Sequence, residues 1–131
     1  MDAGHDVWLG NFRGNSYGLK HTNPAYEKDV RFWQFSWEEH GRLDLPATLG
    51  YVKRVTGVSQ ISYIGHSMGT TALFVMFHHF PEMKNSIRDV VALAPVAYLR
   101  NLGGLVYWFT PAAFSLCRIS NLLQYLSLIH I

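Results

Sequence analysis

Gly65-His66-Ser67-Met68-Gly69 is the stretch that decides the fold of this 131-residue chain. Residues 60–64 before it are typical of a short β-strand, and residues 70–79 after it are typical of an apolar helix. A G-x-S-x-G pentapeptide between a strand and a helix predicts a nucleophile elbow, a turn so tight that its serine is strained and both flanking positions require glycine. In that geometry the Ser67 hydroxyl lies above the carboxyl edge of a sheet, and the first N–H groups of the helix point at any oxyanion formed there.

The remaining elements predict an α/β chain. Residues 6–9 indicate a short strand and residues 88–95 a buried strand, while Asp44 as N-cap and Pro46 in the first turn indicate a helix that ends at Gly57. The apolar face of this helix is expected to consist of Leu45, Leu49, Val52 and Val55. The order strand, helix, strand, helix, strand favours a parallel sheet with right-handed crossovers.

Composition excludes several classes of function. The net charge is +2 without a basic cluster, so neither nucleic acid nor an anionic membrane surface is indicated as a partner. Cys117 is the single cysteine, which rules out an internal disulfide and leaves the redox compartment open. Residues 2–6 are polar and do not resemble a signal peptide. The oligomeric state is left open as well.

The composition of the sequence changes after Pro95. Residues 102–117 are apolar and aromatic, but Gly103-Gly104 and Thr110-Pro111 interrupt them, so no transmembrane helix is expected. Two interpretations stay open for this stretch, a buried or amphipathic helical segment and the start of a lipid-facing cap. Residues 126–131 coincide with one reading-frame translation of a transposase end sequence used in DNA library preparation, and we expect them to be a cloning or sequencing scar.

The chain resembles the acid lipases, the group that contains gastric lipase, lysosomal acid lipase and insect lipase-3-like proteins. The matching stretches are Asp6-Val7-Trp8-Leu9-Gly10-Asn11 with Arg13-Gly14-Asn15, Phe32-Trp33 with Phe35-Ser36-Trp37, Asp44-Leu45-Pro46-Ala47, Gly65-His66-Ser67-Met68-Gly69-Thr70-Thr71, and Ala92-Leu93-Ala94-Pro95-Val96-Ala97. They follow the family's order and spacing. Met68 stands where many members carry glutamine, a tolerable departure because the family uses the backbone N–H of that position in the oxyanion hole.

The resemblance implies a partial α/β-hydrolase core at residues 1–97 and the start of a cap at 98–125, which the expected adapter-derived tail at 126–131 follows. It implies an esterase or lipase of neutral lipid esters, secreted or lysosomal, with no cofactor or metal. Family members have a signal peptide and a strand with a His-Gly motif before this region, and the catalytic aspartate and histidine after it. We therefore expect an internal fragment of a lipase.

A catalytic triad cannot be assembled from the residues of this chain. The family order is serine, then acid, then histidine. His78 lies eleven residues along the helix from Ser67, about 16 Å at 1.5 Å per residue, and Asp89 enters its strand at the opposite edge of the sheet. Glu82 and His79 are the other acid and histidine available after Ser67, and no catalytic role is assigned to them; His130 lies in the suspected scar. The predicted site thus consists of Ser67 as nucleophile and Met68 as backbone oxyanion donor.

For most of the other candidate residues, a structural role is expected rather than a catalytic one. His66 is expected to pack below the elbow, and the aromatic residues 32–37 to belong to the core. For the loop with Asn11, Arg13 and Asn15, a hydrogen-bonded structural role and a role at the mouth of the site both remain open. Cys117 is expected to be a buried or cap thiol. A non-catalytic lipid-binding protein and another acyl-transfer hydrolase, such as a thioesterase, remain as alternative functions.

Overall fold

The computed structural model describes residues 3–27 and 29–98. The expected cap from residue 99 onward, Cys117, His130 and the tail at 126–131 therefore lie outside the described residues. The chain separates into two compact units, Met1–Val96 and Ala97–Ile131, and the fold is that of the first.

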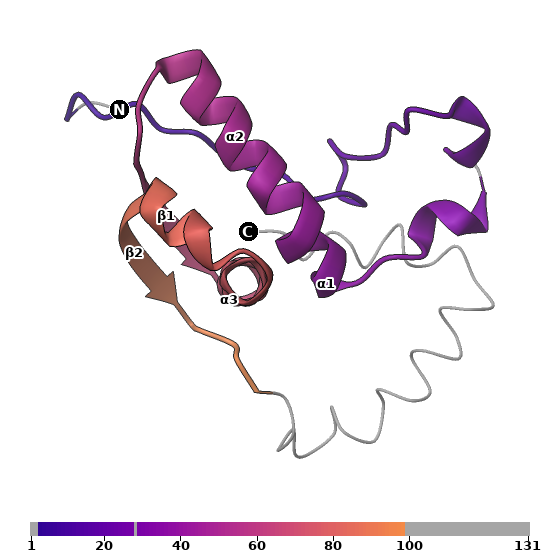
Figure 1. Cartoon of the computed structure of the whole chain (residues 1–131). Coiled ribbons are helices and arrows are strands. Elements are labelled where there is room, and N and C mark those ends of the chain that lie inside the picture. The colour runs from indigo at the N-terminus through magenta and orange to yellow at the C-terminus, as the bar shows by residue number, and fades with distance from the viewer. Residues whose placement is uncertain (1–2, 28, 99–131) are drawn as a thin grey trace. The chain divides into compact units, whose positions relative to one another are not determined.

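The centre of this unit is a strand–helix–strand motif, labelled in Figure 1. Strand β1 (Ile61–His66) leads through Ser67 into helix α3 (Met68–His79), and the 3₁₀ segment η4 (Pro81–Ser86) leads into strand β2 (Ile87–Leu93). The two strands pair in parallel, from Ile61 opposite Ile87 to His66 opposite Leu93, with an irregularity after Ile61. The predicted parallel sheet is confirmed, and the carboxyl ends of both strands meet at one edge.

The helical region before β1 begins earlier than predicted. It runs through the short helix α1 (Trp37–Glu39), the π-helical turn η3 (His40–Asp44) and helix α2 (Leu45–Thr56). Its N-cap is Ser36, whose side chain accepts from the Glu38 N–H while the Glu39 carboxylate accepts from the Ser36 N–H. The prediction of Asp44 as N-cap is wrong, because Asp44 has helical dihedral angles and makes no capping bond.

Helix α2 ends as predicted at Gly57, which caps it with a positive φ of 75°. Leu45, Leu49 and Val52 are buried, as expected. Val55, however, is 54% exposed, so its assignment to the apolar face is wrong. The reason is the helical rotation of about 100° per residue, which places Val55 about 80° from Leu45 and about 120° from Leu49 around the helix axis. Val55 therefore lies outside the buried face.

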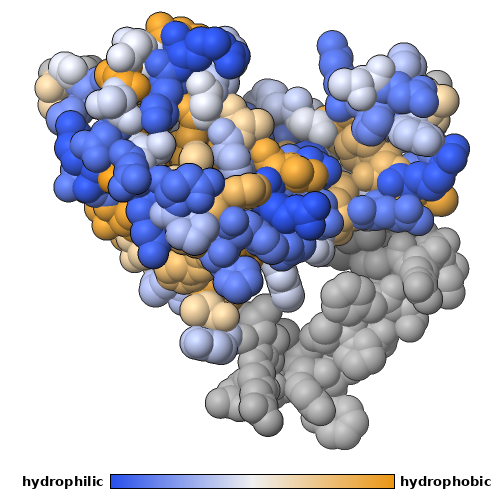
Figure 2. Space-filling view, in the orientation of Figure 1, coloured by the Kyte–Doolittle hydropathy of each residue, from blue (hydrophilic) through white to orange (hydrophobic). Residues whose placement is uncertain are grey.

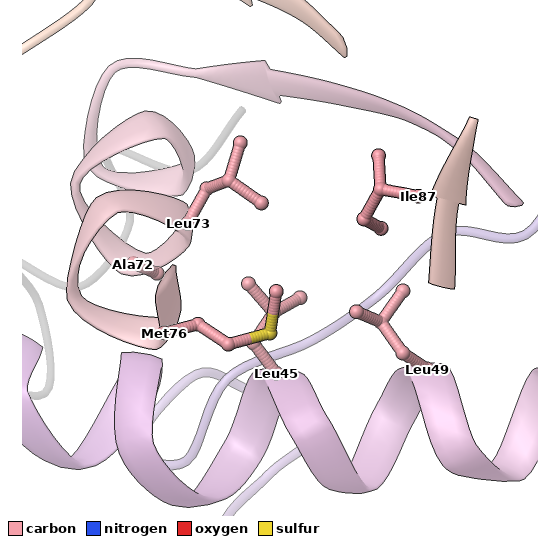
Figure 3. Packing of buried hydrophobic residues seen from close by; sticks show 6 residues of the cluster. All are labelled: Leu45, Leu49, Ala72, Leu73, Met76 and Ile87. Carbon is pink, nitrogen blue, oxygen red and sulfur yellow. The ribbon is translucent and has the colours of Figure 1, made fainter. Parts of the chain in front are cut away.

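The core lies between α2, α3 and the start of β2. Figure 3 shows its six buried side chains, and partly buried aromatic and aliphatic residues pack around them. The cluster consists of Leu45, Leu49, Ala72, Leu73, Met76 and Ile87. Gly41 brings η3 against α3, since a Cβ there would lie 2.5 Å from Val75 Cβ and 2.6 Å from the Ala72 carbonyl oxygen. These contacts fix α3, and with it the elbow at its amino end.

Residues 6–9 are not a strand, contrary to the prediction. The described residues form a sheet of two strands only, and a strand needs a hydrogen-bonded neighbour. Leu9 is exposed, and Trp8 lies edge-on to Tyr51 with ring centroids 6.0 Å apart. Sequence periodicity does not reveal whether such a neighbour is present.

The aromatic residues 32–37 are not part of the buried cluster, so that expectation is wrong too. The stretch follows a short 3₁₀ helix η1 (Pro24–Tyr26) and begins within a second, η2 (Val30–Trp33). Its half-buried rings pack against one another, with Phe32 and Phe35 centroids 6.2 Å apart, and Trp37 is 50% exposed.

The surface of the described residues is mixed. Figure 2 shows hydrophobic side chains interspersed among hydrophilic ones on the face in view. Within residues 3–27 and 29–98, no helix combines the length and the apolar character needed to cross a membrane.

Candidate active site

Ser67 has the backbone conformation of the predicted elbow. It lies between β1 and α3 with φ 47° and ψ −112°, a region that non-glycine residues rarely occupy. Such strain costs about 1–3 kcal/mol and persists only where the surrounding structure enforces it. The turn places the half-buried Ser67 at the carboxyl edge of the parallel strands.

Hydrogen bonds hold both the N–H and the carbonyl group of Ser67. Its N–H donates to the Leu93 carbonyl at 2.9 Å, which ties the elbow to the end of β2. Its carbonyl accepts from the Thr70 N–H at 2.9 Å and from the Thr70 hydroxyl at 2.6 Å. The strained residue is thus held from the neighbouring strand and from the following helix.

The two glycines of the pentapeptide differ in how strictly the structure requires them. A Cβ at Gly65 would lie 2.8 Å from the Tyr63 ring and 3.1 Å from the Gly69 carbonyl carbon, so glycine is needed there, as predicted. A Cβ at Gly69 would meet only the Tyr63 hydroxyl oxygen at 3.6 Å, an ordinary contact. The expectation that both flanks must be glycine is therefore wrong for Gly69.

Met68 is the first residue of α3, with a side chain that is 44% exposed. An N–H at this position has no partner within its own helix, and it carries part of the positive end of the helix dipole. Tyr63 supports the same turn from β1, since its hydroxyl donates to the Gly69 carbonyl at 2.9 Å. Burial raises the pKa of Tyr63 to about 12, so the hydroxyl keeps its proton and remains a donor.

Comparison with protein-family sequences decides the membership of the chain. The family described as the alpha/beta hydrolase fold matches residues 1–125. The chain belongs to the α/β-hydrolase fold family. In this chain, the strand, the Ser67 turn and the helix have the order and backbone geometry expected of a nucleophile elbow.

Curated α/β-hydrolases that the chain resembles confirm the similarity to acid lipases. Gastric triacylglycerol lipase of Rattus norvegicus is 47% identical over 100 residues, covering 76% of this chain and 25% of the relative. Lysosomal acid lipase/cholesteryl ester hydrolase of Homo sapiens is 45% identical over 96 residues, 73% of this chain and 24% of the relative. Lipase member K of Mus musculus is 44% identical over 99 residues, 76% and 25% respectively. The chain spans about a quarter of the length of these relatives.

Two titratable residues after the elbow, His79 and Asp89, make contacts of their own. His79 Nε2 lies 2.6 Å from a Glu38 carboxylate oxygen and joins α3 to α1. Asp89 accepts from the Ser62 hydroxyl and from Arg88 toward the amino end of the strands, and the Arg88 hydrogen bond lowers the pKa of Asp89. Within residues 3–27 and 29–98, no hydrogen bond links the Ser67 hydroxyl to a histidine.

His66, expected to pack below the elbow, is exposed instead. Its side chain follows the alternation of β1 and belongs to the face of Ile64, whereas Tyr63 and Gly65 belong to the face against α3. The expectation is wrong because His66, between Gly65 and Ser67, lies on the exposed face of β1 and not on the face against α3.

The loop with Asn11, Arg13 and Asn15 has the structural role that was one of the two open interpretations. Arg13 Nε and Nη2 donate to Asp44 Oδ1 at 2.8 and 2.6 Å, and the Arg13 N–H donates to Asp44 Oδ2 at 3.0 Å. Asn15 Nδ2 donates to Asn11 Oδ1 at 2.7 Å. These side chains are engaged in fixing the loop to the beginning of α2.

Sequence analysis missed the residues that support the elbow. The Tyr63, Thr70 and Thr71 hydroxyls donate to backbone carbonyl groups around it, namely those of Gly69, Ser67 and Val96. The Thr70 hydroxyl also accepts from the Val96 N–H. No local signal identifies such a role, because Val96 is separated from the threonines by 25 and 26 positions in the sequence.

Proposed function

We propose that this chain carries the nucleophile of a serine hydrolase that cleaves carboxylic esters of neutral lipids. The observation that supports this best is the strained Ser67, with φ 47°, at the strand–helix turn and carboxyl edge of the parallel strands. A strained serine in this place suits attack on a carbonyl group, whereas a protein that only binds lipid has no use for it.

The proposed reaction proceeds through an acyl-enzyme. Ser67 Oγ attacks the ester carbonyl carbon while a histidine base from outside the described residues takes the hydroxyl proton. The Met68 N–H, at the positive end of α3, donates to the oxyanion. Collapse expels the alcohol, which leaves with the proton, and water then hydrolyses the acyl-serine to release the carboxylic acid.

The substrate class is proposed from the relatives. Those with the matching elbow region are named for triacylglycerol and for cholesteryl ester hydrolysis, both of which are neutral lipid esters. We propose the same class here, together with secretion or lysosomal residence. We also propose that residues 98–125 begin a cap over the site that follows the core at 1–97.

The test is covalent labelling in the complete protein that carries this chain. Ser67→Ala should abolish labelling by a fluorophosphonate probe and hydrolysis of a short-chain ester. Ser62→Ala is the matched control, because Ser62 lies on the same strand but bonds Asp89 instead of standing at the elbow. Labelling that survives Ser67→Ala would contradict the nucleophile assignment.

The same protein distinguishes the alternative functions. A lipase should hydrolyse triolein or cholesteryl oleate faster than an acyl thioester of the same chain length. Preference for the thioester would favour a thioesterase. Binding of the lipid without turnover, together with no fluorophosphonate labelling, would favour a non-catalytic lipid-binding protein.

A further inference from the structure

Thr70 and Thr71 connect the elbow to the turn that leaves β2. They lie in the first turn of α3, directly after the Ser67-Met68-Gly69 corner. Ala94, Pro95 and Val96 follow the last residue of β2. Because β1 and β2 are parallel neighbours, both segments lie at the same carboxyl edge.

The Thr70 hydroxyl both donates and accepts a hydrogen bond, which satisfies this buried polar group. Thr70 is only 1% exposed. Its Oγ1 donates to the Ser67 carbonyl at 2.6 Å and accepts from the Val96 N–H at 3.0 Å. One hydroxyl thus bridges the residue proposed as nucleophile and the turn after β2.

Thr71 completes the connection from the next position of α3. Its Oγ1 donates to the Val96 carbonyl at 2.7 Å. The N–H and the C=O of Val96 are therefore both held by threonine hydroxyls of α3. A residue whose backbone N–H and C=O are both held has little freedom to shift along the helix.

The segments so joined contain strained backbone on both sides. Ser67 (φ 47°) and Ala94 (φ 46°) are the non-glycine residues with positive φ in the described part of the chain. They flank the hydrogen bond from the Ser67 N–H to the Leu93 carbonyl. Strain of this kind persists when surrounding contacts over-determine the conformation, and the threonine bonds supply such contacts.

We infer that Thr70 and Thr71 are positioning residues, which hold Ser67 and the 94–96 turn in a fixed relation. The inference rests on the proposed function. It concerns residues that touch no substrate themselves and act through Ser67 and Val96. Loss of the Thr70 hydroxyl should misplace the nucleophile, and misplacement of a reacting atom lowers the rate of the chemical step more than it weakens binding.

The experiment compares Thr70→Val, which keeps the shape and removes the hydroxyl, with Thr70→Ser, which keeps the hydroxyl. In the complete protein, Thr70→Val should lower kcat and the second-order rate of fluorophosphonate inactivation by about tenfold, with KM changed less than twofold. Thr70→Ser should restore both rates to within about threefold of the wild type. Thr71→Val provides the second variant if Thr70→Val does not fold.

Thr56→Val is the control for a merely structural loss. Thr56 Oγ1 donates to the Val52 carbonyl at 2.7 Å in the last turn of α2, so this variant also loses one threonine hydroxyl bond. It should leave the inactivation rate unchanged. Equal rates for Thr70→Val and Thr56→Val, at equal melting temperature, would overturn the positioning role.

Amide hydrogen exchange separates this inference from the proposed function. Exchange of the Val96 N–H should accelerate in Thr70→Val and stay slow in Thr70→Ser. If the wild type is labelled at Ser67 but exchange and rates are unchanged in Thr70→Val, the positioning role is wrong and the hydrolase function stands. If the wild type is not labelled, the function and the positioning role fall together, even where exchange responds.

Discussion

At the scale of single residues, the elbow depends on one of its glycines more than on the other. The Gly65 Cβ position is filled by the Tyr63 ring and the Gly69 backbone, whereas the Gly69 Cβ position has an ordinary neighbour at 3.6 Å. The two substitutions therefore form a matched pair with different outcomes.

Gly65→Ala should destabilise the protein by about 1–3 kcal/mol, because the backbone or the Tyr63 ring must move to admit the methyl group. It should also lower esterase activity, since the displaced segment carries Ser67. Gly69→Ala should retain most of the stability and activity. Thermal unfolding and short-chain ester hydrolysis measure both variants, and an equal loss in the two would contradict the steric argument.

His40 is a second residue whose environment has a measurable consequence. It is 6% exposed and stacks on Phe12, with ring centroids 4.8 Å apart and planes 10° from parallel. In the described residues, neither ring nitrogen has a hydrogen-bond partner. Burial lowers the pKa of His40 from 6.5. The charge of Asp44, the Arg13 backbone and the charge of Glu39 oppose this shift, and the Arg13 charge reinforces it.

We therefore predict a loss of stability on acidification that depends on His40. A lowered folded pKa means that the unfolded chain binds the proton more tightly, so the stabilisation is complete above about pH 6.5 and declines as the pH falls below it. His40→Phe, which keeps the stacking, should show a smaller decrease in melting temperature between pH 7.5 and pH 5.

Melting temperatures measured across this pH range, on the wild type and the variant, test the prediction. His5→Phe is the control, because His5 is exposed. Parallel pH curves for the wild type and His40→Phe would show that the buried imidazole does not contribute.

At the scale of elements, an ion pair helps to tie the loop at residues 11–18 to the helical region. Arg13 holds the Asp44 carboxylate through its guanidinium and its backbone N–H, and the Asp44 side chain is 14% exposed. A bidentate, partly buried pair is stronger than an exposed one. The pair also explains why Asp44 does not cap α2.

Asp44→Asn should cost about 1–3 kcal/mol of unfolding free energy, since it removes the charge from several hydrogen bonds at once. Asp89→Asn is the matched control, because the Arg88–Asp89 pair is 66% and 65% exposed. It should leave the denaturant midpoint almost unchanged. Urea unfolding of the complete protein checks both, and a similar midpoint for the two variants would refute the anchoring role of Asp44.

At the scale of the whole molecule, the described residues leave a large part of the sheet uncovered. Ile64 is 70% exposed, Val91 47% and Leu93 48%. Ile64 of β1 is paired with Val91 of β2, and Leu93 is paired with His66. Parallel strands are normally buried on both faces, and a sheet of two strands has two open edges.

We predict that residues 1–131 expressed alone do not form a stable monomer. Burying side chains of this type is worth about 1.5–3 kcal/mol each, which is comparable in sum with the net stability of about 5–15 kcal/mol of a domain. Size-exclusion chromatography should show aggregates or oligomers, reduced by Ile64→Lys with Val91→Lys. A monodisperse wild-type monomer with a sharp unfolding transition would contradict this.

Local sequence signals predicted the central motif well because short-range rules govern it. The strand before Ser67, the helix after it and the Gly57 cap all follow from periodicity and backbone preference. The strand expected at residues 88–95 is present at Ile87–Leu93, but the expectation that it is buried is wrong, because its residues after Ile87 are exposed. The helix start at Ser36 carries a local signal that the prediction did not use, since Ser36 and Glu39 form a capping box.

The sequence by itself determined the family, the place of the elbow and the parallel pairing, because glycine spacing and apolar periodicity act within a few residues. Tertiary structure alone decided that Asp44 binds Arg13, that residues 6–9 remain unpaired and that Thr70 reaches Val96. Each of these depends on groups brought together from 25 or more positions apart, or on a neighbouring strand, and no local pattern contains that information.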